Sequence, residues 1–235
     1  MNPLAVVVGS TGYIGGRLVP RLLDAGYDVR VLVRHANKLR DVPWADRVNV
    51  MIGDLEDVDS LREAFTGADV IYYLVHSMGP SGQRSFEQTE RLCAGNVARA
   101  AADAGAGRII YLGGLHPEGT LSRHLQSRKE VGDIFLAEPR VPAIVLQAGV
   151  VIGSGSASFE MIRQLTEVLP LMVAPRWVRN KVQPIAIRDV LYYLVAAAGL
   201  PASLNRTFDL GGPDVLRYDE MMNGYAAEAG CGVVR

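Results

Sequence analysis

Residues 6–19 read VVVGSTGYIGGRLV, in which Gly9, Gly12 and Gly15 stand three residues apart. The apolar run over residues 4–8 precedes the glycines and has the composition of a strand buried on both faces. After the glycines, apolar residues recur at helical spacing. The stretch therefore predicts a buried strand, a glycine-rich turn and a helix, in that order.

A unit of this kind is typical of sites that hold the phosphates of a dinucleotide. The first glycine allows a tight turn, the second lets a pyrophosphate approach the backbone, and the third lets the helix pack against the strand. The free N–H groups of the helix N-terminus then face the phosphates. The alternative is a glycine-rich turn without a ligand. The residues expected to contact the cofactor here are Gly9, Ser10, Thr11, Gly12, Tyr13 and Ile14.

The end of the second predicted strand, residues 29–33, indicates which dinucleotide binds. A free ribose 2′-hydroxyl calls for an acidic residue there, about 20 residues after the glycines. This chain instead has Arg34, with Lys38 and Arg40 behind it, and no acid over residues 29–40. A guanidinium matches a 2′-phosphate in charge and in fork geometry. We expect a preference for NADP(H), with NAD(H) as the second candidate, unless Arg34 is only a solvated charge at the strand end.

Three further strand ends are expected to border the same ligand. Asp54, with the Leu55 backbone beside it, follows a third strand and is expected to reach the adenine amino group; the alternative is that Asp54 only caps a turn. Leu74 and Val75 end a fourth strand, and Gly113 follows a fifth. We expect these last three residues on the nicotinamide side of the crevice.

Predicted strands and helices alternate along most of the chain. Strands are expected at 4–8, 29–33, 48–52, 70–75, 108–112, 143–146 and 207–210, and helices at 59–65, 85–104, 123–137, 158–169 and 187–198, besides the helix after the glycines. This alternation predicts an α/β fold with a doubly wound parallel sheet. We expect a dinucleotide-binding core over residues 1–153 and a small substrate lobe, packed on the same domain, over residues 154–235.

The composition argues against several classes of function. The 235 residues are 49% hydrophobic and 21% charged, with a net charge of −1, so neither a nucleic acid nor an anionic membrane is an expected partner. Cys93 and Cys231 have no metal-like spacing and favour a reducing compartment. The start lacks a signal-peptide pattern, and the longest apolar stretch, residues 190–200, is shorter than the roughly 20 residues of a membrane span. We expect a cytoplasmic protein without a bound metal.

The chain resembles the extended or atypical branch of the short-chain dehydrogenase/reductase superfamily, which implies a Rossmann fold that binds NAD(P)(H). The stretches that carry the resemblance are GSTGYIGG at 9–16, VLVR at 31–34, GDLED at 53–57, YYLVHS at 72–77, RIIYLGGL at 108–115, QPIAIRDV at 183–190 and FDLGGP at 208–213. Similar bacterial proteins are often given as nucleoside-diphosphate-sugar epimerases, a label that reflects the fold more than a known reaction. They are often longer, so this chain is expected to be a short version or a piece.

The chain departs from this superfamily at the residues that usually carry the catalysis. Members with ordinary dehydrogenase or epimerase chemistry carry a Ser after the fifth strand and a Tyr four residues before a Lys, and the tyrosinate moves the proton. Here the Ser position falls in Gly113-Gly114, and Leu125 stands four residues before Lys129. The usual mechanism is therefore not expected. Lys129 either hydrogen-bonds the nicotinamide ribose or is one charge in a solvated run.

Two histidines are candidates to replace the missing tyrosine. His76 ends the fourth strand on the expected cofactor side, and an unperturbed imidazole titrates near neutrality. The hypothesis is that His76 is a substitute acid or a substrate contact; the alternative is that it only hydrogen-bonds backbone. His116, after the fifth strand, is the second candidate.

Three functions stay open. The first is an NADPH-dependent reductase of a small apolar or quinone-like acceptor. The second is a non-catalytic NADP(H)-binding redox sensor, resembling nitrogen-repressor-type regulators, or a partner-stabilising subunit, resembling an accessory subunit of respiratory complex I. The third is a nucleoside-diphosphate-sugar epimerase. The alanine-rich helix at 85–104 either packs on the sheet or forms a homodimer face.

Overall fold

The computed structural model describes residues 2–76, 85–116, 119, 121–168 and 176–230, without the side chains of residues 168, 176 and 177. The chain divides into two compact units. One comprises Met1–Gln147 with Leu191–Asp209, and the other comprises Ala148–Val190 with Leu210–Arg235.

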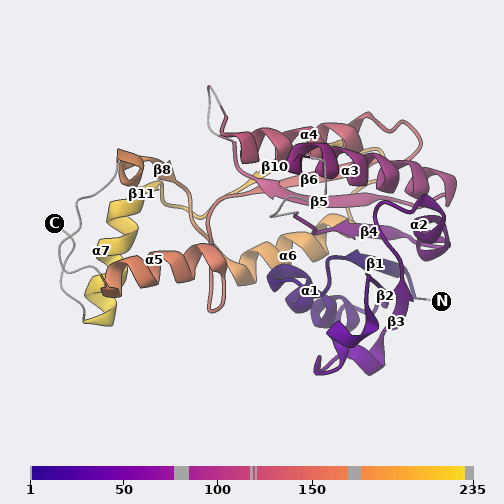
Figure 1. Ribbon diagram of the computed structural model, residues 1–235, viewed down its shortest axis with the longest axis horizontal. Coiled ribbons are helices and arrows are strands. Elements are labelled where there is room, and N and C mark those ends of the chain that lie inside the picture. The colour runs from indigo at the N-terminus through magenta and orange to yellow at the C-terminus, as the bar shows by residue number, and fades with distance from the viewer. Residues whose placement is uncertain (1, 77–84, 117–118, 120, 169–175, 231–235) are drawn as a thin grey trace. The chain divides into compact units, whose positions relative to one another are not determined.

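The first unit is built on a seven-stranded sheet with the strand order β10-β6-β5-β4-β1-β2-β3 (Figure 1). Its strands are β1 (Leu4–Val8), β2 (Asp28–Val33), β3 (Asn49–Ile52), β4 (Val70–Tyr73), β5 (Ile109–Gly114), β6 (Ala143–Ala148) and β10 (Arg206–Leu210). The pairings that join β1 to β5 are all parallel. The strand order reverses between β1 and β4, and ligands of such sheets bind outside the carboxyl ends of the strands at that point.

Helices cover both faces of this sheet. They are α1 (Tyr13–Asp24), α2 (Val58–Phe65), α3 (Phe86–Asp103), α4 (Arg123–Ala137) and α6 (Ile187–Ala198), with the 3₁₀ helices η1 (Ala36–Leu39) and η2 (Ala45–Arg47). Figure 1 shows α3 and α4 on one face and α1 on the opposite face. The expected doubly wound Rossmann fold is confirmed. Of the helices in the described ranges, none is both long and apolar enough to cross a membrane.

The core of this unit lies between the sheet and its helices, because the central strands are apolar along their whole length. Every residue of β4 and β5 is buried. The ring of Phe135, on α4, packs edge-on against Tyr73 and Tyr111, with centroids 5.1 and 5.7 Å away. On the other side, the Tyr72 hydroxyl donates to the Leu194 carbonyl of α6 at 3.2 Å. These contacts fix the carboxyl ends of β4 and β5.

The described residues of the second unit form two complete α-helices, one 3₁₀ helix and two two-stranded sheets. Its elements are β7 (Val151–Ile152), α5 (Ala157–Val168), η3 (Arg176–Arg179), β8 (Lys181–Val182), β9 (Ile185–Ala186), β11 (Leu216–Arg217) and α7 (Tyr218–Ala229). The pairs are β11 with β8 and β7 with β9. Phe159 of α5 packs against the Tyr225 ring of α7, and the Tyr225 hydroxyl donates to Glu167 at 2.5 Å. The two helices therefore share an interface of their own.

This division differs from the expected boundary at residue 153. Residues 191–209 belong to the sheet unit because β10 takes the edge position beside β6. Asn205, just before β10, ties the chain to the sheet unit at this edge. Its side chain accepts from the Ala143 amide at 2.9 Å and donates to the Leu136 carbonyl at 3.0 Å. A strand that pairs with a partner sixty residues earlier cannot be assigned from local pattern, since its pairing is set by tertiary structure.

Candidate functional site

The glycine-rich turn after β1 has no room for a side chain at Gly9 or at Gly15. Gly9 has φ +95°, and a Cβ there would lie 2.9 Å from the Leu74 backbone carbon and oxygen. A Cβ at Gly15 would lie 2.2 Å from the Gly9 oxygen. Gly12, by contrast, has only that oxygen near its Cβ position, at 3.3 Å. The turn thus packs tightly on its inner side and is bare at Gly12.

The N-terminus of α1 begins at this bare position. Gly12 is the N-cap, no side chain caps the helix, and its first turn holds no acid. The first N–H groups of a helix have no partner within it and favour an anion. Ser10 is buried and its hydroxyl has no partner among the described residues. The turn and helix therefore have the geometry of a phosphate cradle.

A cavity of about 520 Å³ extends from this cradle along the carboxyl ends of β1, β2, β3 and β4. Its lining residues are Val8, Gly9, Thr11, Gly12, Leu32, Val33, Arg34, Lys38, Gly53, Asp54, Leu55, Glu56, Leu74, Val75, His76, Thr89 and Cys93. The cavity thus joins the cradle to the end of β2 on one side and to the end of β4 on the other. An elongated ligand with a phosphate centre suits this shape.

Most of the expected contact residues line this cavity. They are Gly9, Thr11, Gly12, Arg34, Asp54, Leu55, Leu74 and Val75, together with His76. Ser10, Tyr13, Ile14, Gly113 and Lys129 are not among its lining residues. The Arg17 guanidinium lies over the Tyr13 ring, with its Cζ atom 4.0 Å from the ring centroid. The Tyr13 hydroxyl is buried and has no partner among the described residues.

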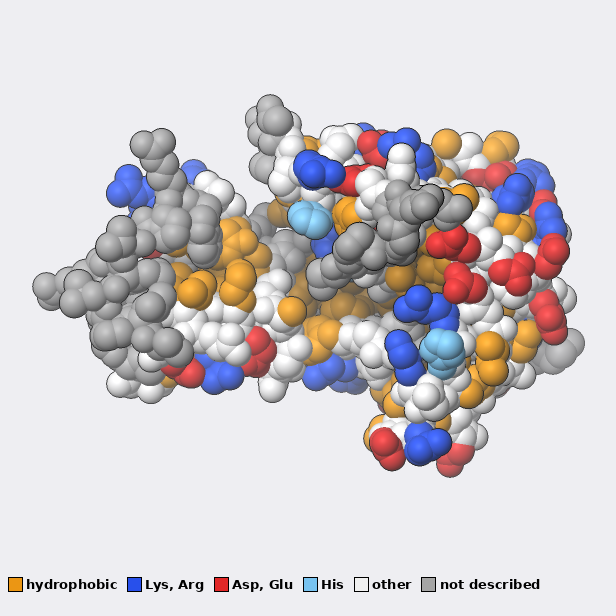
Figure 2. Space-filling model, in the orientation of Figure 1, with side chains coloured by type: hydrophobic (Ala, Val, Ile, Leu, Met, Phe, Trp, Pro, Cys, Tyr) orange, Lys and Arg blue, Asp and Glu red, His pale blue; other side chains and the backbone are white. Residues whose placement is uncertain are grey.

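The end of the cavity at β2 is positively charged. Arg34 and Lys38 are exposed, and neither forms a salt bridge with any residue in the described ranges. Buried Leu39 holds η1, which carries Lys38, against the protein. Figure 2 shows lysine and arginine side chains gathered beside a histidine on the face in view. Two such unpaired cations favour a phosphate at this end.

The loop after β3 is held by short hydrogen bonds. One oxygen of Asp54 accepts from the Glu56 amide at 2.9 Å, as in the turn-capping alternative for this residue, while the residue still lines the cavity. Asn96 of α3 donates to the Leu55 carbonyl at 2.9 Å. The backbone at Leu55 is therefore positioned by a helix, independently of any ligand.

Two lining residues on α3, Thr89 and Cys93, were missed in the sequence. Both are nearly buried, with 5% and 6% of their surface exposed. They lie one helical turn apart and so share a face. The signal was available at Ser85, whose capping box with Gln88 begins α3 and sets that face. Only the tertiary structure brings this face to the cavity.

His76 is neutral in this setting. Its Nδ1 atom is buried and has no partner among the described residues. Burial, and then the positive charge of Arg128, lower the pKa of His76 to about 3. The imidazole is therefore uncharged over the physiological range, in contrast to the near-neutral pKa assumed from the sequence.

The other candidate acid–base residues lie farther along α4 and β5. Lys129 is exposed and pairs with Asp133 at 2.6 Å. Burial, and then the charge of Lys129, lower the pKa of His116, whose Nε2 atom has no partner among the described residues. Neither residue lines the cavity at the cradle.

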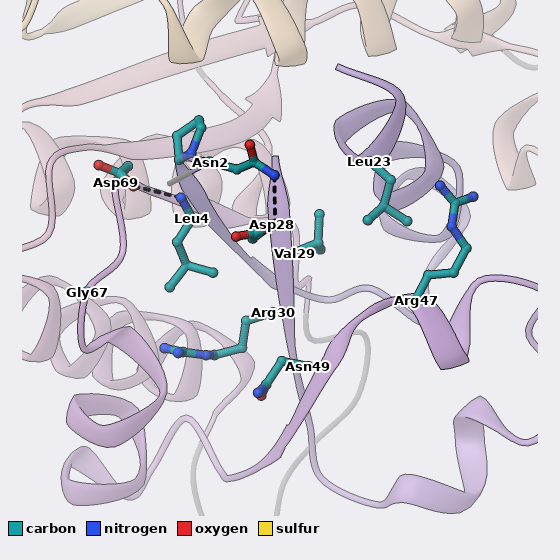
Figure 3. A pocket seen from close by; sticks show the side chains of 11 residues that line it. Asn2, Leu4, Leu23, Asp28, Val29, Arg30, Arg47, Asn49, Gly67 and Asp69 are labelled. Atoms are coloured by element: carbon teal, nitrogen blue, oxygen red, sulfur yellow. Dashed lines mark hydrogen bonds between the residues drawn. The ribbon is translucent and has the colours of Figure 1, made fainter. Parts of the chain in front are cut away.

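A larger cavity, of about 830 Å³, lies at the opposite edge of the sheet, at the amino ends of β1 and β2 (Figure 3). Several of its polar groups are engaged: Asn2 donates to Asp28, Asp69 accepts from the Leu4 amide, and Arg30 donates to the Ala64 carbonyl at 2.7 Å. Its lining holds a single glycine, Gly67, and no helix of the described residues begins there. We therefore place the candidate site at the smaller cavity.

Comparison with known proteins agrees with this placement. Residues 9–142, more than half of the chain, match the model of a family described as NAD(P)H-binding. The chain belongs to the NAD(P)H-binding family. The description of this family makes a nicotinamide dinucleotide its cofactor.

Relatives of this NAD(P)H-binding protein differ in what they do. Cinnamoyl-CoA reductase 1 of Petunia hybrida is 34% identical over 113 residues, which cover 45% of this chain and 33% of that protein. Subunit 9 of the NADH dehydrogenase 1 alpha subcomplex of Arabidopsis thaliana is 26% identical over 230 residues, covering 93% of this chain and 56% of that protein. A nucleoside-diphosphate-sugar epimerase of Staphylococcus aureus has the same fold, with a TM-score of 0.81 and 17% identity over 100% of this chain and 79% of that one. The chain spans 33% of the length of the Petunia hybrida reductase and 56% of the length of the Arabidopsis thaliana subunit, so it corresponds to only part of each of these curated relatives.

In this NAD(P)H-binding protein, the places of the superfamily's Ser and Tyr lie next to each other. A Cβ at Gly114 would lie 3.1 Å from the Leu125 Cδ2 atom and 3.5 Å from an Arg128 guanidinium nitrogen. A Cβ at Gly113 would instead lie 3.2 Å from the Tyr111 ring. Gly114, and not Gly113, is therefore the glycine that faces Leu125.

Proposed function

We propose that this protein is an NADPH-dependent reductase of a small apolar or quinone-like acceptor. The observation that carries the proposal is the cavity itself: it extends from the turn at Gly12 to Arg34 and Lys38, two cations that form no salt bridge with the described residues. Bound NADPH supplies a hydride. The protein's own part is to hold the phosphates, to neutralise the 2′-phosphate, and to leave an apolar wall of Leu74 and Val75 toward the acceptor.

The missing Ser and Tyr favour an acceptor that needs no positioned proton donor. A carbonyl reduced to an alcohol takes up a proton at the developing alkoxide, and Leu125 cannot supply one. A quinone-like acceptor places the incoming charge on a stable conjugated oxygen, which water can protonate later. In this proposal His76, neutral and at the end of β4, is a contact for the acceptor and does not act as its acid.

Lys129 would contribute to cofactor binding only by exchanging Asp133 for the nicotinamide ribose. An exposed ion pair of this kind is worth at most about 1 kcal/mol, so the exchange is not costly. We therefore propose a secondary role for Lys129, smaller than that of Arg34.

The first experiment is a calorimetric titration of the protein with NADPH, NADP⁺, NADH and NAD⁺. Arg34→Asp is expected to weaken NADPH by at least about tenfold and NADH by much less, since a charge-assisted contact to a phosphate is lost. Arg40→Asp is the matched control, because it makes the same charge change at an exposed residue that does not line the cavity. Equal weakening by both variants would contradict the assignment of Arg34.

Turnover is tested next by following NADPH oxidation with menadione, under conditions that exclude oxygen. Reduction that depends on the protein and disappears in Arg34→Asp supports the reductase. Tight NADPH binding without oxidation of any acceptor in a quinone panel would contradict it.

The second candidate function is a non-catalytic NADP(H)-binding sensor or partner-stabilising subunit. It is supported by the apolar Gly114–Leu125 contact and by similarity over most of the chain to a subunit of NADH dehydrogenase. A sensor requires a large difference in affinity between NADP⁺ and NADPH, because a ligand shifts a conformation only through differential binding. The same calorimetric titration measures that difference. An epimerase is a third, weaker candidate, supported by the shared fold and opposed by Leu125.

A further inference from the structure

The side chain of Arg128 lies over bare backbone at the carboxyl end of β5. A Cβ at Gly114 would stand 3.5 Å from its Nη1 atom and 3.8 Å from its Cδ atom. The Arg128 backbone is fixed as well, because its carbonyl accepts from the Tyr111 hydroxyl at 3.2 Å. The absence of a side chain at Gly114 is thus what admits the guanidinium to this edge of the sheet.

The positive charge of Arg128 has no ion-pair partner among the described residues. Its neighbours on α4 are paired: Arg123 with Glu87 and Lys129 with Asp133, each at 2.6 Å. The buried acid of the adjacent helix, Glu90, accepts instead from the Ser127 hydroxyl. Arg128 is half-buried and forms no salt bridge with any residue in the described ranges. A partly desolvated cation without a counter-ion is costly, and an anionic ligand would relieve that cost.

Arg128 does not line the cofactor cavity, but its guanidinium lies at the carboxyl end of β5, next to the strand whose end borders that cavity. His76, which lines that cavity, is close enough for Arg128 to contribute to the lowering of its pKa. The His76 ring also lies 6.3 Å from the Tyr111 ring, edge-on, so the two strand ends meet at this point. The result is a guanidinium and a neutral imidazole with an open nitrogen at one side of the site.

This pair can bind an oxygen but is a poor proton donor. A guanidinium stays charged at any physiological pH, and a neutral imidazole is a weak acid. We propose that Arg128 binds and stabilises the negatively charged oxygen that forms on the acceptor, and that the acceptor is therefore a quinone or a comparable conjugated carbonyl compound whose reduced form persists as an anion. This inference rests on the proposed reductase function and specifies its substrate class.

In the proposed step the acceptor would receive a hydride, which is two electrons and one proton, from the carbon–hydrogen bond that the bound dinucleotide gives up. A new bond to hydrogen would form at one end of the acceptor's conjugated system. A carbonyl π pair of the acceptor moves onto its oxygen, which becomes the anion held by Arg128. Water protonates that oxygen afterwards, so no side chain has to lose a proton. Preorganised charge of this kind stabilises a transition state without reorganisation.

The test compares two probes of similar size by calorimetry, with and without NADP⁺. Lawsone is a hydroxynaphthoquinone that is an anion at neutral pH, and menadione is its neutral methyl counterpart. Arg128→Met is expected to weaken lawsone by tenfold or more and menadione by less than threefold. Arg128→Lys should give an intermediate loss, since it keeps the charge and loses the fork. Arg123→Met, on the same helix but exposed and paired, is the control and should change neither.

A second readout does not depend on turnover. In ¹H–¹⁵N spectra of the imidazoles, the His76 pKa should rise in Arg128→Met and stay unchanged in Arg123→Met. Equal effects on lawsone and menadione, or no binding of lawsone to the wild-type protein at millimolar concentration, would overturn the inference. Failure of the reductase proposal is seen separately, as absence of NADPH binding or of NADPH oxidation.

Discussion

Gly114 at the end of β5 and Leu125 on α4 are in direct apposition: a Cβ on Gly114 would lie 3.1 Å from the Leu125 Cδ2 atom. The resemblance places the superfamily's serine within Gly113-Gly114 and its tyrosine at Leu125. A side chain added at Gly114 would therefore meet Leu125.

This contact predicts non-additive stability. Gly114→Ala should destabilise the protein by about 1–2 kcal/mol, because the new methyl group crowds Leu125. In the double variant with Leu125→Ala, about 1 kcal/mol of that loss should be recovered as coupling. Urea unfolding of the four proteins measures it. Gly95→Ala is the control, since nothing lies within 4 Å of its Cβ position on α3. Strict additivity would show that the two side chains do not meet.

Alanine substitutions at two glycines of the turn should affect stability and NADPH affinity separately. Gly12→Ala should change stability by less than about 1 kcal/mol, because only one oxygen, at 3.3 Å, is near the new methyl group. It should nevertheless weaken NADPH by about tenfold or more, since the methyl group stands where the pyrophosphate approaches.

Gly15→Ala should do the reverse and cost about 3 kcal/mol or more, because its methyl group would lie 2.2 Å from the rigid Gly9 oxygen. Thermal unfolding and calorimetric titration check both variants. A Gly12→Ala protein with full NADPH affinity would refute the phosphate cradle.

His76 should make stability depend on pH. Its pKa is about 3 in the folded protein against 6.5 for an ordinary histidine, so the unfolded chain binds the extra proton first. Stability should therefore fall as the pH drops below about 6.5, by up to about 1.4 kcal/mol per pH unit, until the folded-state pKa is reached. His76→Gln should lose less stability between pH 7 and pH 5 than the wild type. His35→Gln, at an exposed site, should follow the wild type; the prediction fails if both variants do so.

Arg108 should be a major structural residue although it lies far from the cradle. Its guanidinium is nearly buried and donates to the carbonyls of Ala197, Leu200 and Pro201, at 3.0, 2.7 and 2.6 Å, around the end of α6. Arg108→Met would leave these acceptors unpaired and should cost about 2–4 kcal/mol in urea unfolding. The control is Arg91→Met, whose pair with Glu130 is exposed to solvent and should contribute little to stability. Similar costs for the two variants would contradict this role of Arg108.

The sequence alone was sufficient to predict the architecture of the sheet unit, the glycine-rich phosphate turn and the cation at the end of β2. Continuous apolar runs such as Leu4–Val8, followed by glycines at fixed spacing, predict a buried parallel strand and a phosphate turn, because both depend on neighbours within one short segment. The cation at Arg34 was visible for the same reason. Leu125 four residues before Lys129 likewise predicts that the usual proton relay is absent.

Tertiary structure decided what the rest of the site contains. Thr89 and Cys93 reach the cavity only because α3 packs at the ends of β3 and β4, and β10 joins the sheet beside β6 from more than fifty residues away. The neutrality of His76 and the open charge of Arg128 follow from burial and from the missing side chain at Gly114. Electrostatic environment and packing are sums over residues distant in sequence, so no local pattern encodes them.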